Sequence, residues 1–463
     1  MAAVRKLVGV IAAATLGASL AGCTSDEPGA TPEPTPSATT PSASESSTEP
    51  VALELAVYGG PRRVAVYERI VAAFTDEHPE VEVELTSYPD AEAAAESIEV
   101  LLANESGPDV FLLDPTYLPS FVQDERLQPL DTLLEDRGLQ FGDDYQRAAL
   151  TAFSASSRLQ CMPAEMSPLV VYYNRDLISR QQLAAEEIVL PRGEETWTWE
   201  EFVVAARQAA LTDGFGPVKG VHLPADLETL TAFIRSAGGE VVDDLLEPTS
   251  LTLTSDDALT AIAEVVQLAR DDKIALSVED VEKRPAIDWF TDGQLGMFIG
   301  TREDLPRLRK VDGLRFDAVS LPSLGRSRSV SRMSGLCIAA RSDSVDAAAD
   351  LVAFAVGPEG SRIAARSGAI VPAKLDVIHD EAFTQPSKQP RSAEAFAAGV
   401  RRSDPLPYSA AWVEVEEAAD EVLTGLYRRP GLNLDEDELE ARLARLDQRS
   451  VELFADAETV VEE

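Results

Sequence analysis

The chain has 463 residues, with 40 Lys and Arg against 80 Asp and Glu, which gives a net charge of −40 at pH 7. A surface this acidic repels nucleic acid and anionic lipid, so the composition excludes nucleic acid as a partner and excludes a protein that lies flat on a membrane. The length is sufficient for two or three domains, and an apolar fraction of 45% supplies a sizeable core. We interpret the acidic residues mainly as a solvated surface.

The first fifty residues form a segment of their own. Arg5 and Lys6 precede an apolar stretch, residues 7–20, which is too short to span a bilayer because a spanning helix needs about 20 apolar residues. The stretch ends in Leu20-Ala21-Gly22-Cys23 and resembles the signal peptide and lipobox of a bacterial lipoprotein. The resemblance implies that residues 1–22 are removed, that Cys23 is acylated, and that the mature protein stays on the outer face of a cell membrane. An ordinary secretory signal remains as the alternative.

Residues 24–50 are almost all Ser, Thr, Pro, Ala and Glu. They show no apolar periodicity, so they cannot bury enough surface to offset the entropy of the chain. Together with the acylated Cys23 they are predicted to form a disordered tether over residues 23–50, which as a random chain spans roughly 30 Å. An anchor of this kind favours a host with a single membrane, of the Gram-positive, actinobacterial type.

After the tether, strands and helices are predicted to alternate. The expected elements are a strand over 51–58, a helix from about 64 that ends before Pro79, a strand over 80–88, a helix over 91–103 and an apolar strand over 108–113. This order favours an α/β fold in which helices cover both faces of a mostly parallel sheet, with binding at the carboxyl ends of its strands.

The same mixed pattern continues to the end of the chain. Strands are predicted over 169–173 and 296–299, and helices over 199–211, 256–270, 344–356 and 434–454. The helix that begins at residue 199 follows Thr198, and Glu201 stands three residues beyond that threonine, which is the pattern of a capping box.

Beyond Cys23 the chain has two cysteines, Cys161 and Cys337, and both lie in strand-like runs. An even pair of cysteines in an exported protein is consistent with a disulfide, and two buried free thiols are the alternative. The sequence alone does not decide between them.

No pattern for catalysis or metal binding stands out. The three histidines, His78, His222 and His379, are far apart in the sequence and have no clustered partner, whereas a zinc site needs grouped His or Cys ligands. The chain also lacks a glycine loop that cradles phosphate and a nucleophile-elbow pattern. We therefore predict no metal, no cofactor and no catalytic residue.

Five segments, in order, resemble motifs of the extracellular solute-binding proteins of ATP-driven importers, in the sugar-binding group known as family 1 or maltose-binding-like. The segments are residues 74–81, residues 108–111 with 127–131, residues 162–177, residues 290–297 and residues 335–360. Each motif alone is weak, but together they cover nearly all of residues 51–463. The resemblance implies a two-lobed periplasmic-binding-protein fold (type II) with discontinuous α/β lobes, a hinge, and a ligand held in the cleft.

The resemblance also implies the organisation of the two lobes. The N-terminal lobe would comprise residues 51–163 and 335–380, and the C-terminal lobe would comprise 164–334 and 381–463. Crossing strands are expected near 160–168 and 332–339. These strands would bring Cys161 beside Cys337, where a bridge would stiffen closure of the cleft. The family also implies a monomer.

A sugar cleft needs flat apolar faces for C–H surfaces and planar polar groups for hydroxyls. Candidates stand at the positions where the resemblance places the cleft: Tyr58, Asp114, Tyr117, Glu165, Ser167, Trp289, Arg302 and Trp412. Arg302 stands where members of the family often have tryptophan, and a guanidinium can bind an anionic group through two hydrogen bonds. A neutral sugar and an acidic or phosphorylated sugar therefore both remain open as ligands.

We accordingly predict a lipid-anchored binding protein that captures a carbohydrate-like ligand and delivers it to the transmembrane subunits of an ABC permease, with no chemistry of its own. One alternative is a sensor lipoprotein that binds ligand without a permease. The other is an anchored enzyme that processes the cell wall on a similar α/β scaffold, which would need an acid–base pair with perturbed pKa values.

Overall fold

The computed structural model describes residues 50–211, 218–428 and 435–462, with side chains described as far as residue 456. The predicted signal peptide, Cys23 and nearly all of the tether lie outside the described residues. None of the described helices combines the length and the apolar composition that crossing a membrane requires.

The first sheet contains seven strands, and its order is β12-β6-β11-β3-β1-β2 with β13 paired to β11. The strands are β1 (Val51–Tyr58), β2 (Val81–Tyr88), β3 (Val110–Leu113), β6 (Cys161–Pro168), β11 (Ser329–Ile338), β12 (Val371–Pro372) and β13 (Ser403–Asp404). β1 runs parallel to β2 and β3, whereas β11 runs antiparallel to both β3 and β6. The sheet is therefore mixed rather than mostly parallel, because later segments of the chain return to it in the opposite direction.

The second sheet contains four strands in the order β10-β7-β9-β8. They are β7 (Val170–Asn174), β8 (Lys219–His222), β9 (Leu295–Gly300) and β10 (Phe316–Ser320). This sheet is also mixed, since β7 is antiparallel to its two neighbours and β8 is parallel to β9. Two sheets, each with its own helices, give the predicted α/β class.

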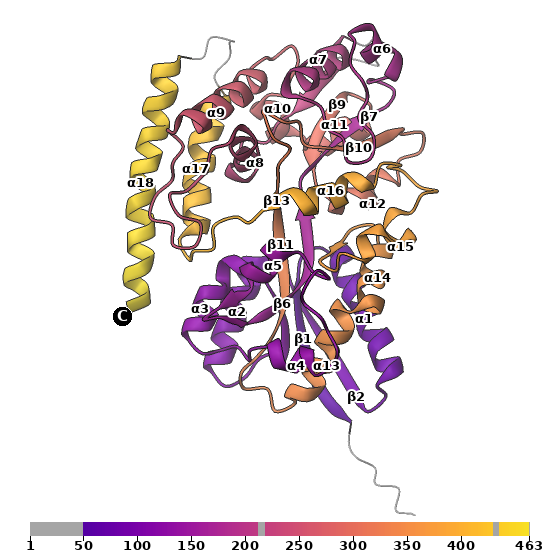
Figure 1. The fold of residues 1–463 in the computed structure, drawn as a ribbon, viewed down its shortest axis with the longest axis vertical. Helices are drawn as coiled ribbons and strands as arrows, with labels where there is room; N and C mark the ends of the chain where they lie inside the picture. The colour runs from indigo at the N-terminus through magenta and orange to yellow at the C-terminus, as the bar shows by residue number, and fades with distance from the viewer. Residues whose placement is uncertain (1–49, 212–217, 429–434, 463) are drawn as a thin grey trace, which may run out of the picture. The chain divides into compact units, whose positions relative to one another are not determined.

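Long helices cover the sheets, and Figure 1 shows their arrangement. Over the first sheet lie α1 (Pro61–Glu77), α2 (Ala91–Ala103), α13 (Val345–Val356) and α14 (Pro358–Arg366). With the second sheet lie α7 (Trp199–Ala210), α8 (Leu227–Ala237), α9 (Asp256–Ala269), α17 (Trp412–Tyr427) and α18 (Glu436–Glu462). α8 packs on α9, α17 packs on α18 and α7 packs on β8.

Shorter elements complete the described chain. They are η1 (Pro115–Tyr117), α3 (Leu118–Gln123), α4 (Asp131–Glu135), α5 (Arg147–Ala152), β4 (Ser154–Ala155), β5 (Arg158–Leu159), α6 (Arg180–Ala185), α10 (Val278–Lys283), α11 (Ala286–Thr291), η2 (Arg302–Asp304), α12 (Leu305–Leu308), η3 (Val377–His379), α15 (Glu381–Thr384) and α16 (Glu394–Arg402). The last of these, α16, contacts strands of both sheets: β6 and β11 of the first, and β7 and β10 of the second.

The chain passes between the sheets through β6 and β11, which lie side by side (Figure 1). β6 ends at Pro168 and β7 of the other sheet begins at Val170, while β10 ends at Ser320 and β11 begins at Ser329. The two crossing segments expected from the sequence are therefore adjacent. The lobe boundaries predicted at residues 163 and 335 fall inside these two strands, which pair from Cys161 to Pro168.

Cys161 and Cys337 are direct partners in the register of β6 and β11, and they form a disulfide. Cys161 is the first residue of β6, so roughly 23 Å of extended strand separates it from Pro168, where the chain leaves the first sheet. The bridge thus ties two strands inside the first sheet. Because both bridged residues lie in the same sheet, the disulfide does not directly restrain the closure of the cleft, contrary to the prediction from the sequence.

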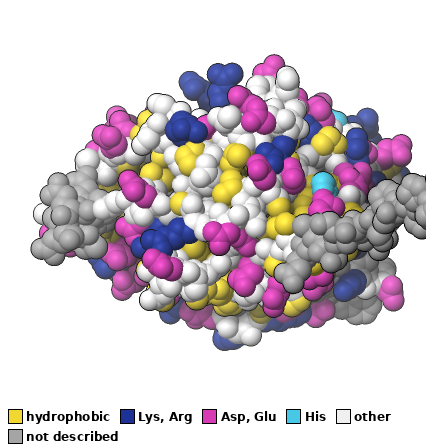
Figure 2. Space-filling model, turned by 90° about the horizontal axis from the view of Figure 1, so that it is seen from below, with side chains coloured by type: hydrophobic (Ala, Val, Ile, Leu, Met, Phe, Trp, Pro, Cys, Tyr) yellow, Lys and Arg dark blue, Asp and Glu magenta, His cyan; other side chains and the backbone are white. Residues whose placement is uncertain are grey.

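Acidic side chains are spread over the face shown in Figure 2, with basic and apolar side chains between them. Several arginines of the described chain pair with acids, as Arg366 does with Glu359 at 3.9 Å. The distribution agrees with a solvated acidic surface.

Candidate ligand-binding site

The site begins at the carboxyl ends of two parallel neighbours, β1 and β3. Tyr58 is the last residue of β1, and Asp114 follows the last residue of β3, so the two side chains stand at one edge of the first sheet. Gly59 has a φ of +113°, a conformation that favours glycine and lets the chain turn into α1. This turn places Arg63 in the first turn of α1, directly beside the strand ends.

Arg63 is the centre of a compact group that we call the Arg63 cluster: Tyr58, Arg63, Tyr67, Glu165 and Ser334. The guanidinium donates from Nη2 to Glu165 Oε2 at 2.9 Å and to Ser334 Oγ at 2.7 Å. Tyr67 donates its hydroxyl to Glu165 Oε1 at 2.6 Å, and the hydroxyls of Tyr58 and Ser334 are 2.6 Å apart. Every charged group in the cluster therefore has a partner.

Burial accounts for the electrostatics of the Arg63 cluster. The side chain of Glu165 is only 4% exposed, and β6 places it in register with Ser334 at the point where the pairing of β6 and β11 shifts. Burial opposes the charge on Arg63, but the Glu165 carboxylate outweighs it and raises the pKa of Arg63. Burial and the neighbouring carboxylate raise the pKa of Tyr67 well above its ordinary value. The cluster is a neutralised ion pair with hydroxyls around it.

A second group, the Arg332 cluster, consists of Glu228, Arg332 and Glu416. Arg332 of β11 donates from Nε to Glu228 Oε2 at 2.8 Å and from Nη2 to Glu416 Oε1 at 3.3 Å. Glu228 comes from the first turn of α8 and Glu416 from α17. One cation, 48% exposed, thus holds two carboxylates whose side chains are each 15% exposed.

Asp114 lies within electrostatic range of both arginines. Burial raises its pKa, while Arg332 and Arg63 lower it. Its Oδ1 accepts from the backbone N–H of Thr116 at 3.0 Å, and it forms no ion pair with any described residue. Burial and the charge of Asp114 together raise the pKa of Tyr117 to about 12. Asp114 and Tyr117 therefore belong to one electrostatic neighbourhood with the two clusters.

A pocket of about 430 Å³ opens beside the Arg63 cluster. It is lined by the start of α1, by Glu303 of η2 and by a segment next to β12: Gly60, Pro61, Arg62, Arg63, Glu303, Ala369 and Ile370. Because η2 follows β9 of the second sheet, this pocket has walls from the helices and turns of both sheets. Arg63 links this pocket to the Arg63 cluster.

Four of the predicted site residues, Tyr58, Asp114, Tyr117 and Glu165, come together in this neighbourhood. A fifth, Ser167, is in register with Arg332 across β6 and β11, so it stands beside the Arg332 cluster. The structure thus gathers five residues that are up to 109 positions apart in the chain, from Tyr58 to Ser167.

Trp289 lies on α11, half-buried against the first core. The Arg284 guanidinium lies over its ring, 5.4 Å from the centroid. Its indole Nε1 is buried and has no hydrogen-bond partner among the described residues. This unsatisfied donor leaves Trp289 as a candidate for contact with a ligand.

Two predicted positions are corrected by their burial. Arg302 is 1% exposed, and its guanidinium lies 3.7 Å from the ring centroid of Phe383 and donates to the Phe383 carbonyl at 2.6 Å. Burial lowers the pKa of Arg302 to about 9. Trp412, also 1% exposed, packs in the second core at the start of α17. Neither side chain is available to a ligand, because the 3₁₀ turn and the helix start direct both of them inward.

Sequence reasoning missed Arg63, Glu228, Arg332 and Glu416. Arg63 carried a usable signal, because it follows a Gly-Gly-Pro break at the end of a predicted strand, where binding groups gather. Arg332 began a predicted crossing segment. Glu228 and Glu416 gave no signal, since each is one acid among many on a helix, and only the packing of α8 on β11 and of α17 on α8 brings them to Arg332.

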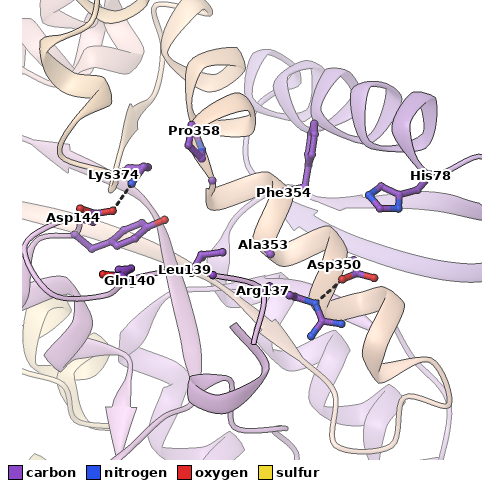
Figure 3. A pocket seen from close by; sticks show the side chains of 13 residues that line it. His78, Arg137, Leu139, Gln140, Asp144, Asp350, Ala353, Phe354, Pro358 and Lys374 are labelled. Atoms are coloured by element: carbon purple, nitrogen blue, oxygen red, sulfur yellow. Dashed lines mark hydrogen bonds and ion pairs between the residues drawn. The ribbon is translucent and has the colours of Figure 1, made fainter. Parts of the chain in front are cut away.

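A different pocket, of about 480 Å³, lies near the end of α1 and beside α13 (Figure 3). No residue of the two clusters lines it. Its lining includes His78, Arg137, Phe354 and Lys374. Figure 3 shows the two cations already paired, Arg137 with Asp350 and Lys374 with Asp144 at 2.9 Å. With its charges satisfied internally, this pocket offers less to a polar ligand than the neighbourhood of Asp114.

Across the described ranges, no group of three or more His, Cys, Asp or Glu side chains is placed to hold a metal ion. His222 is partly buried on β8, and this burial lowers its pKa to about 4, so it is neutral at physiological pH. The polar groups described above are suited to hydrogen bonding with a ligand.

Two α/β units joined by paired crossing strands, with charged side chains gathered beside the crossing, define a two-lobed binding protein. Residues 69–391 match the family of bacterial extracellular solute-binding proteins. The chain belongs to that family. Because its members are binding proteins and not enzymes, the prediction that this chain does no chemistry is confirmed.

Individual relatives agree with this assignment. The galactooligosaccharide-binding protein of Bacillus subtilis is 21% identical over 381 residues, which cover 80% of this chain and 85% of that protein. The sugar-binding protein MalE of Xanthomonas citri has the same fold, with a TM-score of 0.74 at 19% identity over 89% of this chain and all of that one. The substrate-binding protein Lmo0181 of Listeria monocytogenes, solved with cycloalternan, gives a TM-score of 0.71 at 17% identity over 86% and 99%. The predicted two-lobed fold is confirmed.

Proposed function

We propose that this protein is a lipid-anchored, extracellular binding protein that captures a saccharide between its two lobes and delivers it to an ABC permease. The observation that carries the proposal is the pair of arginine clusters with Asp114 and Tyr117 beside them. Planar guanidinium and carboxylate groups bind neighbouring hydroxyls in pairs, and an aromatic face covers the C–H surface of a pyranose. These are the groups that a polyhydroxylated ligand needs.

The relatives support the carbohydrate class. The Bacillus subtilis relative is named for galactooligosaccharide, and two of the solved neighbours are described as a sugar-binding protein and a complex with cycloalternan. The likeness to these three extends over 80% or more of this chain.

The anchor and the transport role rest on the sequence. Acylation at Cys23 followed by a tether would keep the protein close to a permease in the same membrane, which raises their effective concentration. A sensor that binds the same ligand without a permease is the alternative role.

Binding is tested with the purified mature domain and a panel of neutral, amino and acidic mono-, di- and trisaccharides, by thermal shift and titration calorimetry. A specific ligand at a hundredfold excess over its dissociation constant should stabilise the protein by about 2.7 kcal/mol. Asp114→Asn should weaken binding, whereas Asp312→Asn at an exposed position serves as the matched control. If no saccharide changes the melting temperature or releases heat, the proposed function is wrong.

The anchor is tested separately by fractionation of cells that express the full chain. Wild-type protein should sediment with membranes, and Cys23→Ala should appear in the medium or remain as uncleaved precursor. Equal membrane association of both proteins would contradict lipidation at Cys23. Co-purification of the wild-type protein with transmembrane subunits is the result expected for uptake, and its failure would favour sensing.

A further inference from the structure

The charges of the two clusters and Asp114 do not balance, although both cluster arginines are paired. Glu165 neutralises Arg63, but Arg332 alone serves Glu228 and Glu416, and Asp114 has no ion pair with a described residue. Two guanidinium groups therefore face four carboxylates. A net negative charge on a whole protein is ordinary, but here the unbalanced carboxylates are withdrawn from water.

Burial makes this imbalance costly. The side chains of Glu228 and Glu416 are each 15% exposed, and a buried carboxylate without a counter-charge is strongly disfavoured. Burial raises the pKa of Glu228 to about 7 and also raises the pKa of Asp114 and Glu416. The structure thus holds acids that a nearby cation would stabilise in their charged form.

Unused hydrogen-bonding atoms show where such a cation can bind. Glu228 accepts one bond at Oε2, which leaves Glu228 Oε1 without a partner among the described residues, whereas the Asp114 carboxylate is bonded by the backbone and the side chain of Thr116 but has no cationic partner there. The hydroxyl of Tyr408 is also buried without a partner in that part of the chain, and it lies within electrostatic range of Asp114. A free carboxylate oxygen thus lies beside Arg332, and an unpartnered hydroxyl lies within range of Asp114.

An anionic ligand has no comparable site within the two clusters. The guanidinium of Arg63 is engaged by Glu165 and Ser334, and that of Arg332 by Glu228 and Glu416. Arg302, the other arginine considered for an anion, is buried beneath Phe383. A carboxylate or phosphate on the ligand would meet more negative charge than positive charge.

We propose that the ligand is a saccharide bearing at least one protonated amino group, held by the Asp114 carboxylate and the free oxygen of Glu228 beside Arg332. The inference rests on the proposed function, because it assigns a charge class to the ligand of that same site. An ammonium group donates three hydrogen bonds and accepts none, so it is suited to bind carboxylate oxygens. The hydroxyls of the same ligand would bind to the Arg63 cluster.

The experiment compares sugars that differ only in charge. Hexosamines of gluco, galacto and manno configuration, and their short oligomers, are titrated beside the N-acetylated forms, the neutral parent sugars and the uronic acids. We expect an amino form to bind most tightly, by about tenfold or more over its own N-acetylated and neutral counterparts, because it forms charge-assisted hydrogen bonds.

Two variants locate the preference. Asp114→Asn and Glu228→Gln should bring the ratio of affinities for the amino and neutral forms towards one, while changing the affinity for the neutral form much less. Asp312→Asn, a control of the same kind on the exposed surface, should leave the ratio unchanged.

The outcomes separate the two proposals. If the tightest ligand of the panel is neutral or acidic, the charge assignment is overturned and the saccharide-binding function stands. A preference for the amino form that survives in both variants overturns the assignment to Asp114 and Glu228. If no sugar of any charge binds, the proposed function itself fails.

Discussion

The two arginine clusters lie in one electrostatic neighbourhood, yet they differ in how their charges are satisfied. In the Arg63 cluster a single carboxylate faces a single guanidinium, and two tyrosines and a serine take up the remaining hydrogen bonds. In the Arg332 cluster one half-exposed guanidinium is divided between two carboxylates. The first cluster is complete without a ligand, and the second is not.

This difference separates a structural role from a binding role. Glu165 and Ser334 lie on the two crossing strands and Arg63 on the helix that follows β1, so the Arg63 cluster joins three segments of the first sheet. The Arg332 cluster joins one crossing strand to α8 and α17, which accompany the second sheet. We expect substitutions in the first cluster to lower stability most and those in the second to change binding most.

The largest effect is expected from Glu165→Ala. Removing this carboxylate leaves Arg63 buried without a counter-charge, which should lower the free energy of unfolding by about 3–5 kcal/mol. Denaturant unfolding followed by circular dichroism measures it, with Glu68→Ala, at an exposed acid of the same helix as Arg63, as the control. A loss below about 1 kcal/mol would remove the distinction between the clusters, because surface ion pairs have that magnitude.

Removal of the disulfide by Cys161→Ser with Cys337→Ser should have the next largest effect. Loss of a native disulfide typically costs about 2–4 kcal/mol, and here the bridge ties two strands of the first sheet. Saccharide affinity should change less than twofold, since the bridge is distant from Pro168. Thermal unfolding and calorimetry of the double variant give both quantities. A large loss of affinity in a fully folded double variant would show that the bridge controls closure of the cleft.

Tyr67→Phe should lower stability by about 2 kcal/mol, because the removed hydroxyl donates to a buried carboxylate and bonds to charged groups are stronger than neutral ones. The substitution keeps the ring and its packing. Tyr88→Phe, on a half-buried tyrosine of β2, is the matched control for loss of a hydroxyl. Equal stability of the two variants would contradict a tight Arg63 cluster.

The smallest effect is expected at Glu228, and it depends on pH. Burial raises the pKa of Glu228 to about 7, Arg332 opposes this shift, and Asp226 and Glu416 add to it. The folded state therefore holds the proton more tightly than the unfolded state, so this group stabilises most below about pH 4.5 and loses that contribution as the pH rises to about 7.

Glu228→Gln should flatten that part of the stability profile, by about 1 kcal/mol between pH 5 and pH 8, because contact with water and the exposure of Arg332 reduce the effect. Melting temperatures of the variant and the wild type across this range measure it. If the wild type instead becomes more stable than the variant as the pH rises, Arg332 fully offsets the cost of burying the charged Glu228 carboxylate, and the expected pH dependence is wrong.

Local signals in the sequence predicted much of the fold. The strands at 51–58 and 80–88 and the helix at 91–103 are present as β1, β2 and α2. The capping box of Thr198 and Glu201 forms at the start of α7, with both hydrogen bonds in place. These elements depend on periodicity and on caps only a few residues long, which can be read from the sequence.

The site was predicted only in part, because its remaining residues depend on packing between distant segments. Tyr58 and Asp114 were found because they follow strands whose ends meet at one edge. Trp412 and Arg302 were misplaced, since nothing in the sequence shows that a helix start or a 3₁₀ turn directs a side chain inward. Glu228 and Glu416 are 188 positions apart and meet only at Arg332.

The disulfide also determines how the chain would behave when it is cut. It closes a loop between residues 161 and 337, and all four strands of the second sheet, β7 to β10, lie inside that loop. The second sheet is therefore an insertion whose two ends are covalently joined. A protease that cuts once between these cysteines releases no fragment: the pieces migrate together on a gel until a reductant separates them. For a protein exposed outside the cell, a single nick in this half of the molecule would leave the chain in one covalent piece.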